Sequence, residues 1–203
     1  MNTETYPLLI AIAGVSGAGK STLCDNAVVA GLCSHRVVTV TSRPPREGET
    51  DGISYHFWTA EKIMQGIAAG LFIEYECIHG QDDDRIYGTL RESIIGPLRK
   101  SQTIITNMNV DGIESLRREA ETNFLLRSAL TTIFMRLDRA TMMERLQKRG
   151  MSREEIDRRI ISAQEEVKHA DKFEYSFESR TIDEDLDELR KIMVTKRGIL
   201  DMQ

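Results

Sequence analysis

A glycine-rich segment near the start of this 203-residue chain has the residue types and spacing needed to hold a phosphate group. It fits the pattern GxxxxGK[ST], in which glycines let successive backbone N–H groups point inward at an anion. The segment consists of Gly14, Val15, Ser16, Gly17, Ala18, Gly19, Lys20, Ser21 and Thr22. Lys20 supplies a full positive charge to the β- and γ-phosphates of a nucleotide, and the Ser21 hydroxyl can ligate Mg²⁺. The motif alone does not distinguish a kinase from a GTPase or a motor ATPase.

A second group of residues could bind another phosphate. Arg43 and Arg46 lie three positions apart in the proline-stiffened segment SRPPREGETDG. Two guanidinium groups at this spacing can converge on one anion, and each can offer a bidentate fork that lysine lacks. Tyr55 and Tyr87 could add neutral hydrogen-bond donors to the same oxygens. Alternatively, the arginines are solvated loop charges and the tyrosines lie at the edge of a core.

A base could be recognised in the same region. Glu74 lies in an otherwise apolar segment, where a carboxylate suits the adjacent N1–H and N2–H₂ donors of guanine. The Thr39 hydroxyl could donate to guanine O6. Taken singly, Glu74 is equally compatible with a surface position on an edge strand. Because both residues follow a phosphate loop in the same chain, a binding site is the favoured interpretation.

A later charged stretch could neutralise a moving phosphoryl group. Arg145 and Arg149 precede Gly150, and Arg158 and Arg159 follow it. Phosphoryl transfer needs positive charge on the transferring oxygens and exclusion of water, which a closing helical segment can supply. The alternative is a solvated helix face laced with salt bridges, because several acidic residues lie nearby.

The elements that must position these residues follow from the hydrophobic pattern. Short β-branched or apolar runs predict strands, and longer charged, periodic stretches predict helices. The predicted strands are 8–13, 37–41, 54–58, 71–78, 103–106, 131–137 and 173–177. The predicted helices are 21–30, 60–69, 91–100 apart from Gly96-Pro97, 111–130, 139–169 with a break at Gly150, and 184–197. Alternation of strands and helices indicates an α/β fold with a central parallel sheet.

Across nearly its whole length the sequence resembles the guanylate kinase family. The resemblance is carried by GVSGAGKST, TSRPPREGETDGISYHF, FIEYECIHG with IYGT, ERLQKRG, RRIISAQEE and ADKFEYSF. It implies a three-layer P-loop NTPase fold with a small β-rich GMP-binding module and a helical lid. A single domain over 1–203 would divide into a core (1–38, 90–138 and 170–203), a module (39–89) and a lid (139–169).

The resemblance also implies a reaction and a role for each motif residue. The reaction is transfer of the γ-phosphate of ATP, held with Mg²⁺, to GMP and to dGMP. Arg43, Arg46, Tyr55 and Tyr87 would hold the GMP phosphate. The guanine would face Thr39, Glu74, Thr89 and Asn109. The lid arginines Arg145, Arg149 and Arg159 would clamp the phosphates together with Lys20.

The sequence departs from the family pattern after the predicted strand 103–106. The family usually carries two aspartates there, one near the magnesium waters and one near the guanine amino group. This chain has Asn107 and Asn109 at those positions, and asparagine can accept a hydrogen bond but carries no charge. The segment FESRT also lacks the usual asparagine-containing motif near the adenine. Metal affinity and base selectivity are the properties that these changes affect.

Composition excludes several classes of protein. The net charge of −5 and pI of about 5.5 argue against nucleic acid as the main partner. Three widely spaced cysteines fit neither a disulfide framework nor a zinc pattern. The apolar run at the N-terminus is too short for a membrane span and lacks a basic flank. We therefore expect a cytoplasmic enzyme. The resemblance to guanylate kinases implies ATP and GMP as its ligands, and the protein would be either a monomer or a homodimer.

Three alternatives to GMP phosphorylation remain at the level of sequence. The acceptor could be another nucleoside monophosphate or a ribose bisphosphate. The chain could be a non-catalytic, peptide-binding module of the same fold, although such a module has no need for Lys20. It could also be a P-loop switch or ATPase, which would leave the arginine-rich acceptor segment unexplained.

Overall fold

The computed structural model describes residues 6–78 and 85–202. Parts of the predicted core and module lie outside the described residues, namely 1–5, 79–84 and 203. They include His79 and Gly80, which end the FIEYECIHG segment.

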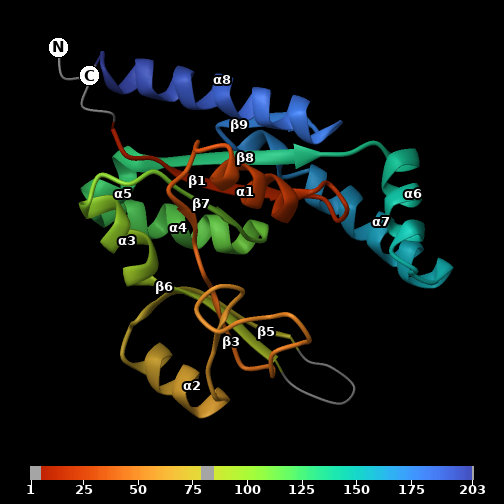
Figure 1. Ribbon diagram of the computed structural model, residues 1–203, viewed down its shortest axis with the longest axis horizontal. Coiled ribbons are helices and arrows are strands. Elements are labelled where there is room, and N and C mark those ends of the chain that lie inside the picture. Colours follow the sequence, from red (N-terminus) through yellow and green to blue (C-terminus); the bar gives the residue numbers. More distant parts are fainter. Residues whose placement is uncertain (1–5, 79–84, 203) are drawn as a thin grey trace.

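A five-stranded parallel sheet forms the centre of the molecule, with strand order β2-β7-β1-β8-β9 (Figure 1). The strands are β1 (Leu9–Gly14), β2 (His35–Arg36), β7 (Ile104–Asn107), β8 (Leu130–Arg136) and β9 (Tyr175–Glu178). Every residue of β1 is buried, as expected for the middle strand of a sheet covered on both faces. The predicted α/β fold with a central parallel sheet is confirmed.

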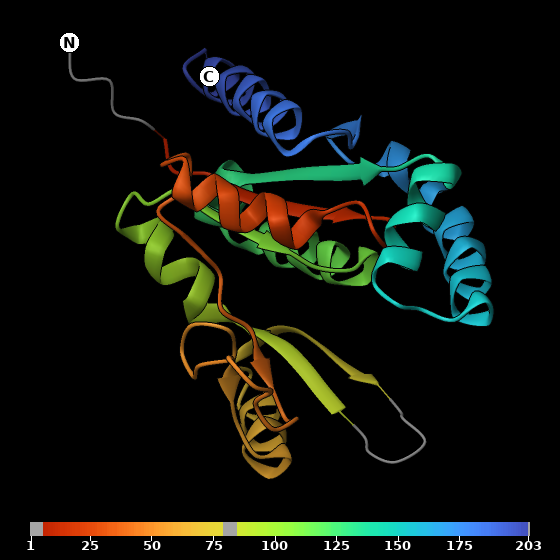
Figure 2. The same ribbon diagram turned by 45° about the vertical axis from the view of Figure 1, so that its right-hand side comes forward.

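Helices cover both faces of this sheet and give the three layers (Figures 1 and 2). On one face α1 (Lys20–Val29) packs against α8 (Ile182–Leu200), while α3 (Arg91–Arg99), α4 (Val110–Thr122) and α5 (Phe124–Ala129) lie on the other. Beyond the carboxyl end of β8, α6 (Arg139–Lys148) and α7 (Arg153–Val167) pack against each other. A 3₁₀ turn, η1 (Ala170–Lys172), leads into β9.

A second, four-stranded sheet lies below the first, with strand order β4-β3-β6-β5 (Figure 1). Its elements are β3 (Val40–Thr41), β4 (His56–Phe57), α2 (Ala60–Ala68), β5 (Phe72–Ile78) and β6 (Arg85–Leu90). It has its own small core of four buried side chains, Val40, Ile63, Phe72 and Ile86. The sequence pattern did not assign β6, because its short run includes Arg85 and Gly88.

The single strand predicted over 37–41 is wrong, because the chain passes from one sheet to the other within it. The Val37 N–H still donates to Ile105 O at 2.8 Å, beside β7 of the central sheet. Two residues later, Thr39 O accepts from His56 N at 2.8 Å, beside β4 of the second sheet. β-Branched residues favour extended backbone in either sheet, so their run shows no boundary.

Two helix predictions also need correction. The segment predicted as one helix over 111–130 is two helices, and Asn123 ends α4 and caps α5 by accepting from Leu126 N at 3.1 Å. Gly96 and Pro97, expected to interrupt their helix, lie inside α3. The fixed φ of proline is helical, and near the end of a short helix it removes one hydrogen bond. The predicted break at Gly150 is confirmed, with φ +74° at that residue.

Candidate active site

The loop between β1 and α1 wraps around the side chain of Lys20. Gly17 and Gly19 have φ of +84° and +87°, in the left-handed region that glycine adopts at no steric cost. The Lys20 ammonium donates to Gly14 O and, at 3.0 Å, to Val15 O. Burial lowers the pKa of Lys20, and the charges of Arg149 and Arg159 act in the same direction. The Lys20 ammonium is therefore enclosed by the backbone of the loop. It lies at the N-terminus of α1, and both the ammonium and the helix N-terminus favour binding of an anion there.

Three lid arginines predicted from the sequence reach toward this loop. Arg145, from α6, donates to Gly17 O at 3.2 Å and to Ser179 Oγ at 3.3 Å. Arg159, from α7, donates to Ser16 Oγ at 2.8 Å. Arg149 lines a cavity of about 360 Å³ beside Gly17 and Gly19. The two helices therefore bring positive charge to the phosphate loop from outside the central sheet.

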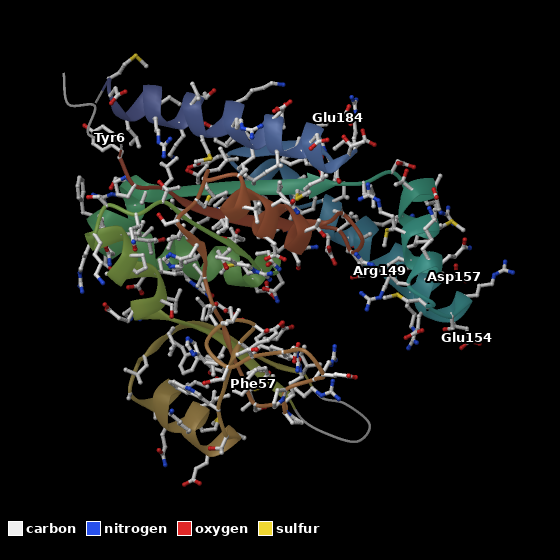
Figure 3. The ribbon with its side chains drawn as sticks, viewed as in Figure 1. Tyr6, Phe57, Arg149, Glu154, Asp157 and Glu184 are labelled. Atoms are coloured by element: carbon white, nitrogen blue, oxygen red, sulfur yellow. The ribbon has the colours of Figure 1, made fainter. Side chains whose placement is uncertain are left out.

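Two acidic residues near the start of α7 lie away from the phosphate loop, whereas Glu165 and Glu166 line a cavity together with Lys20. Figure 3 shows Arg149 on the side of the lid nearest the core, whereas Glu154 and Asp157 lie at its outer end. The lid also carries salt bridges on its surface, such as Lys148 with Glu144 at 2.6 Å, as the alternative of a solvated helix face expects.

The 360 Å³ cavity continues past Arg145 to a short turn before α8, within the segment FESRT. The buried Asp185 holds this turn by accepting from Ser179 Oγ at 2.8 Å and from Arg180 N at 3.0 Å. Arg145 also donates to Arg180 O at 2.7 Å. Nothing in the residue spacing marked Asp185.

A larger cavity, of about 790 Å³, lies between the two sheets. Its wall includes six of the residues predicted to bind the acceptor, together with the proposed metal ligand Ser21. The six are Thr39, Tyr55, Glu74, Tyr87, Thr89 and Asn109. Thr89 Oγ donates to Glu74 Oε1 at 2.5 Å, and burial raises the pKa of Glu74. A half-buried carboxylate that lines a cavity can accept hydrogen bonds from a ligand there.

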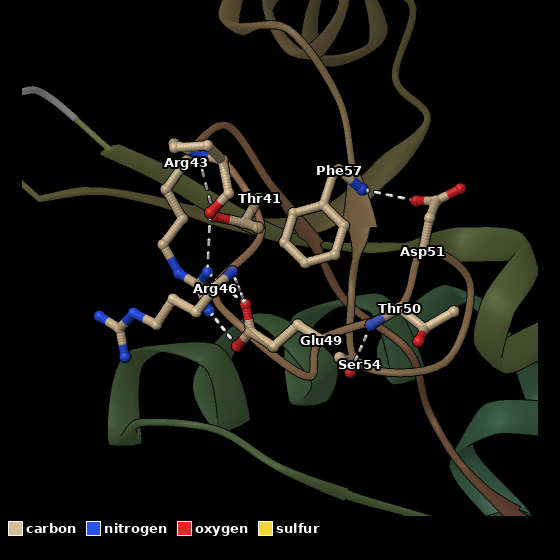
Figure 4. A network of polar contacts seen from close by, with 9 residues as sticks. Thr41, Arg43, Arg46, Glu49, Thr50, Asp51, Ser54 and Phe57 are labelled. Carbon is tan, nitrogen blue, oxygen red and sulfur yellow. Dashed lines mark hydrogen bonds and ion pairs between the residues drawn. The ribbon is translucent and has the colours of Figure 1, made fainter.

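Arg43 and Arg46 do not converge in this structure. Arg43 is buried, lies 5.0 Å from the Tyr55 ring centroid, and donates with both ends of its fork to Glu49 at 2.6 Å (Figure 4). Arg46 donates to Glu49 through its backbone N–H at 2.8 Å, and its guanidinium group points away (Figure 4). Neither arginine lines the 790 Å³ cavity, although Glu49 does. The convergence predicted from their spacing is therefore absent here.

Glu49 is the residue that sequence reasoning missed at this point. The ion pair with Arg43 lowers the pKa of Glu49 to about 2 and raises that of Arg43 above its ordinary value. A carboxylate three residues after Arg46 in a loop is also typical of a solvated turn, so residue spacing did not indicate the pairing. Glu49 occupies the fork that an acceptor phosphate would otherwise use.

The two asparagines lie on the wall that separates the cavities. Asn107 and Asn109 line both the 790 Å³ cavity and a third one, of about 540 Å³, which Lys20 and Arg159 also line. Asn107 Oδ1 accepts from Arg36 Nη2 at 2.7 Å, and Arg36 also pairs with Asp25 at 2.9 Å. Asp111, which the sequence could not place, lines the 540 Å³ cavity from the first turn of α4.

The donor atoms around the phosphate loop fit a magnesium ion that arrives with a nucleotide. Within residues 6–78 and 85–202 no group of three or more His, Cys, Asp or Glu side chains could hold a metal. Mg²⁺ commonly uses few protein ligands and completes its shell with phosphate oxygens and water. The exposed Ser21 hydroxyl, in the first turn of α1, is an oxygen donor of that kind. In the part of the chain that the structure describes, no helix has the length and apolar character to cross a bilayer.

Comparisons with known proteins agree on one family. The family model described as guanylate kinase matches residues 6–196. A guanylate kinase of Helicobacter pylori (strain ATCC 700392 / 26695) is 31% identical over 188 residues, which cover 92% of this chain and 84% of that protein. The guanylate kinase of Caldanaerobacter subterraneus subsp. tengcongensis is 27% identical over 205 residues, covering 99% and 93%.

A solved structure shows the same fold. The crystal structure of guanylate kinase from Anaplasma phagocytophilum superposes with a TM-score of 0.68 at 21% identity, and covers 95% of this chain and 87% of that one.

Proposed function

This chain belongs to the guanylate kinase family, and on that basis we propose that it transfers the γ-phosphate of ATP to GMP, giving ADP and GDP. One observation carries the proposal beyond family membership. The cavity that holds Glu74 and Thr89 shares the wall formed by Asn107, Met108 and Asn109 with the cavity that holds Lys20. A base-binding site and a phosphate-binding loop are therefore adjacent, as direct transfer between two nucleotides requires.

The mechanism relies on positioning and charge. ATP lies with its phosphates on the loop 14–22, and Lys20 leaves its backbone acceptors to contact the β- and γ-phosphates. Arg145, Arg149 and Arg159 neutralise the equatorial oxygens of the moving group. An oxygen of the GMP phosphate attacks the γ-phosphorus in line, and the bond to the β-phosphate oxygen breaks. No protein nucleophile is needed, because the attacking oxygen is already anionic.

The acceptor is held by the second sheet and its loops. We propose that Glu74 accepts from the guanine edge, Thr39 and Thr89 complete that contact, and Tyr55 and Tyr87 donate to the phosphate. Arg43 joins them by exchanging a Glu49 oxygen for a phosphate oxygen, and Arg46 swings inward from its solvated position. The polypeptide then consists of a core (1–38, 90–138, 170–203), an acceptor module (39–89) and a lid (139–169). dGMP is accepted as well, because none of the residues assigned to the acceptor needs a ribose 2′-hydroxyl.

The family uses a divalent metal with ATP, and we propose Mg²⁺ held through the Ser21 hydroxyl. When bound, the ion neutralises charge on the β- and γ-phosphates. The chain's own contribution is to orient Ser21 at the start of α1 and to keep Asn107 and Asp111 near the phosphates as hydrogen-bond partners for water.

A coupled ADP-release assay over a panel of acceptors tests the function. GMP, dGMP, IMP, AMP, UMP and ribose 1,5-bisphosphate would each be offered with saturating ATP–Mg²⁺. We expect GMP to give the highest kcat/KM, with dGMP next and with AMP and UMP lower by at least about a hundredfold, because Glu74 repels their acceptor edges. ADP release that does not depend on GMP would instead support an ATPase, and a preference for the bisphosphate would support another acceptor.

A further inference from the structure

Glu76 faces the acceptor cavity, and the proposed function leaves it without a role. Residues two apart on a strand point to the same face, so Glu74 and Glu76 on β5 lie side by side. Across the antiparallel pair with β6, Glu74 is opposite Thr89 and Glu76 is opposite Tyr87. All four residues line the 790 Å³ cavity. One face of this hairpin therefore presents two carboxylates to a single ligand site.

Asn109 is in direct contact with this second carboxylate. Its Oδ1 accepts from Gly112 N at 2.8 Å and thereby caps α4, which determines which end of the amide carries the nitrogen. Its Nδ2 donates to Glu76 Oε2 at 3.1 Å. The residue at the position where the family has an aspartate thus directs its N–H group at a carboxylate supplied by another element.

The electrostatics explain why residue 109 is neutral. Two ionised carboxylates within about 3–4 Å of each other are unfavourable, and one of them would take up a proton. Glu76 already raises the pKa of Glu74, in addition to the larger effect of burial. An asparagine at 109 avoids a third negative charge and instead donates a hydrogen bond to Glu76. Glu76 is exposed in the open cavity, so its charge is solvated until a ligand covers it.

We propose that Glu76 is a specificity-determining residue, which accepts a hydrogen bond from the 2-amino group of the acceptor purine. Glu74 then accepts from N1–H, and Asn109 positions Glu76. The preferred ligands are 6-oxopurine nucleotides that carry a 2-amino group, in preference to IMP, which lacks that donor. The inference rests on the proposed function, because it assumes that a purine nucleotide occupies the cavity.

The test compares GMP with IMP in three variants. We expect Glu76→Gln to lower kcat/KM for GMP by about 10- to 100-fold, as for loss of one hydrogen bond to a charged group, while IMP changes by less than about threefold. Asn109→Asp should also weaken GMP selectively, because it places a second carboxylate against Glu76, whereas aspartate still caps α4. The double variant moves the single carboxylate back to 109 and should recover most of the GMP rate.

Controls separate this inference from the proposed function. Glu61→Gln, on α2 of the same module, removes an equal charge from a residue that does not line the cavity and should leave both rates unchanged. Calorimetric titration with GMP and IMP in the absence of ATP reports base binding without turnover. A wild-type protein that ignores GMP would overturn the function itself. If the wild type is active on GMP, two results would overturn only the role of Glu76. One is an unchanged ratio of kcat/KM for GMP to that for IMP in Glu76→Gln. The other is a double variant whose kcat/KM for GMP is no higher than in the single variants.

Discussion

The side chain of Lys20 carries the donor half of the proposed reaction. In the structure carbonyls of the phosphate loop hold its ammonium beside that loop, and in the proposed mechanism it exchanges them for phosphate oxygens. A cation aimed at the transferring group stabilises the charge of the transition state.

We expect Lys20→Ala to lower kcat by at least about a hundredfold, as for removal of one key transition-state donor. The thermal midpoint should change little, because the substitution removes a half-buried charge along with its hydrogen bonds. Steady-state kinetics with saturating ATP and GMP, combined with calorimetry, measures both quantities. Turnover within about threefold of the wild type would contradict the assigned role.

Arg43 should be sensitive to shape as well as charge. Arg43→Lys keeps the positive charge but loses the planar fork that contacts both oxygens of Glu49. In the proposed mechanism the same fork binds the GMP phosphate. We expect KM for GMP to rise by about tenfold, equivalent to one charge-assisted hydrogen bond, with KM for ATP unchanged. Initial rates at varied concentrations of each nucleotide separate the two constants, and an equal effect on both would place Arg43 outside the acceptor site.

The residues that sequence reasoning missed share one physical cause. Glu49 and Glu76 acquire their roles from partners that the sequence does not display. Glu76 meets Asn109, 33 positions later, through the placement of β5 against α4. The prediction that Arg46 converges with Arg43 failed for a different reason. An exposed arginine side chain has no fixed orientation unless a ligand binds it. Motif residues such as Lys20 were predictable because strand, loop and helix are consecutive in the chain.

At the scale of elements, β1 and the phosphate loop are tightly constrained by β8. Gly14 has φ +141°, and a Cβ added there would lie 2.1 Å from Met135 O. Because the obstacle is backbone of a neighbouring strand, it cannot rotate away. The tight fit places the start of the loop directly against the central sheet.

Gly14→Ala should therefore destabilise the protein by more than about 2 kcal/mol or prevent folding. Gly198→Ala is a matched control, because a Cβ in that turn of α8 meets nothing within 4 Å. Alanine there should leave stability unchanged or raise it by up to about 1 kcal/mol. Urea unfolding of both variants decides the point, and equal midpoints would show that the close approach to Met135 is relieved elsewhere.

The lid helix α7 depends on a capping box at its start. Ser152 Oγ accepts from Glu155 N at 3.3 Å, and Glu155 Oε2 accepts from Ser152 N at 3.1 Å. We expect Ser152→Ala to cost about 1 kcal/mol and to raise KM for ATP, because α7 carries Arg159. Thermal unfolding should show a fall of about 2–4 °C. Ser115→Ala, inside α4, keeps every cap and should not reproduce the effect.

Strands were predictable where a continuous run of hydrophobic residues lies within a single sheet. β1, β7 and β8 are buried apolar runs, and each follows the predicted range closely. The run over 37–41 failed because its residues bond to two different sheets. The 111–130 helix failed because the cap formed by Asn123 interrupts a periodic pattern that continues on both sides.

At the scale of the whole molecule, the acceptor module and the lid flank the central sheet (Figure 2). Cavities of about 790 and 540 Å³ lie along the residues that face them. Arg46 and the lid arginines can meet the same pair of nucleotides only if these parts approach each other. Exclusion of water from the transferring group requires the same movement.

We expect the radius of gyration to decrease when GMP and a non-hydrolysable ATP analogue bind together, and to decrease less with either alone. Small-angle X-ray scattering measures this directly, and Lys20→Ala provides a comparison with a weakened donor site. A scattering curve that is unchanged by both ligands would mean that the open arrangement is already the reactive one.

The passage of the chain between the two sheets has a consequence for how substrate selection and movement are connected. The peptide links at 37–39 and the junction between Leu90 and Arg91 are the covalent bridges between the sheets. Thr39 belongs to the first of them, and Thr89 immediately precedes the second. Any rotation of the acceptor module must twist backbone next to these two hydroxyls. A correct base that fixes both threonines would therefore stiffen both bridges together, so that fidelity and closure depend on the same few torsion angles.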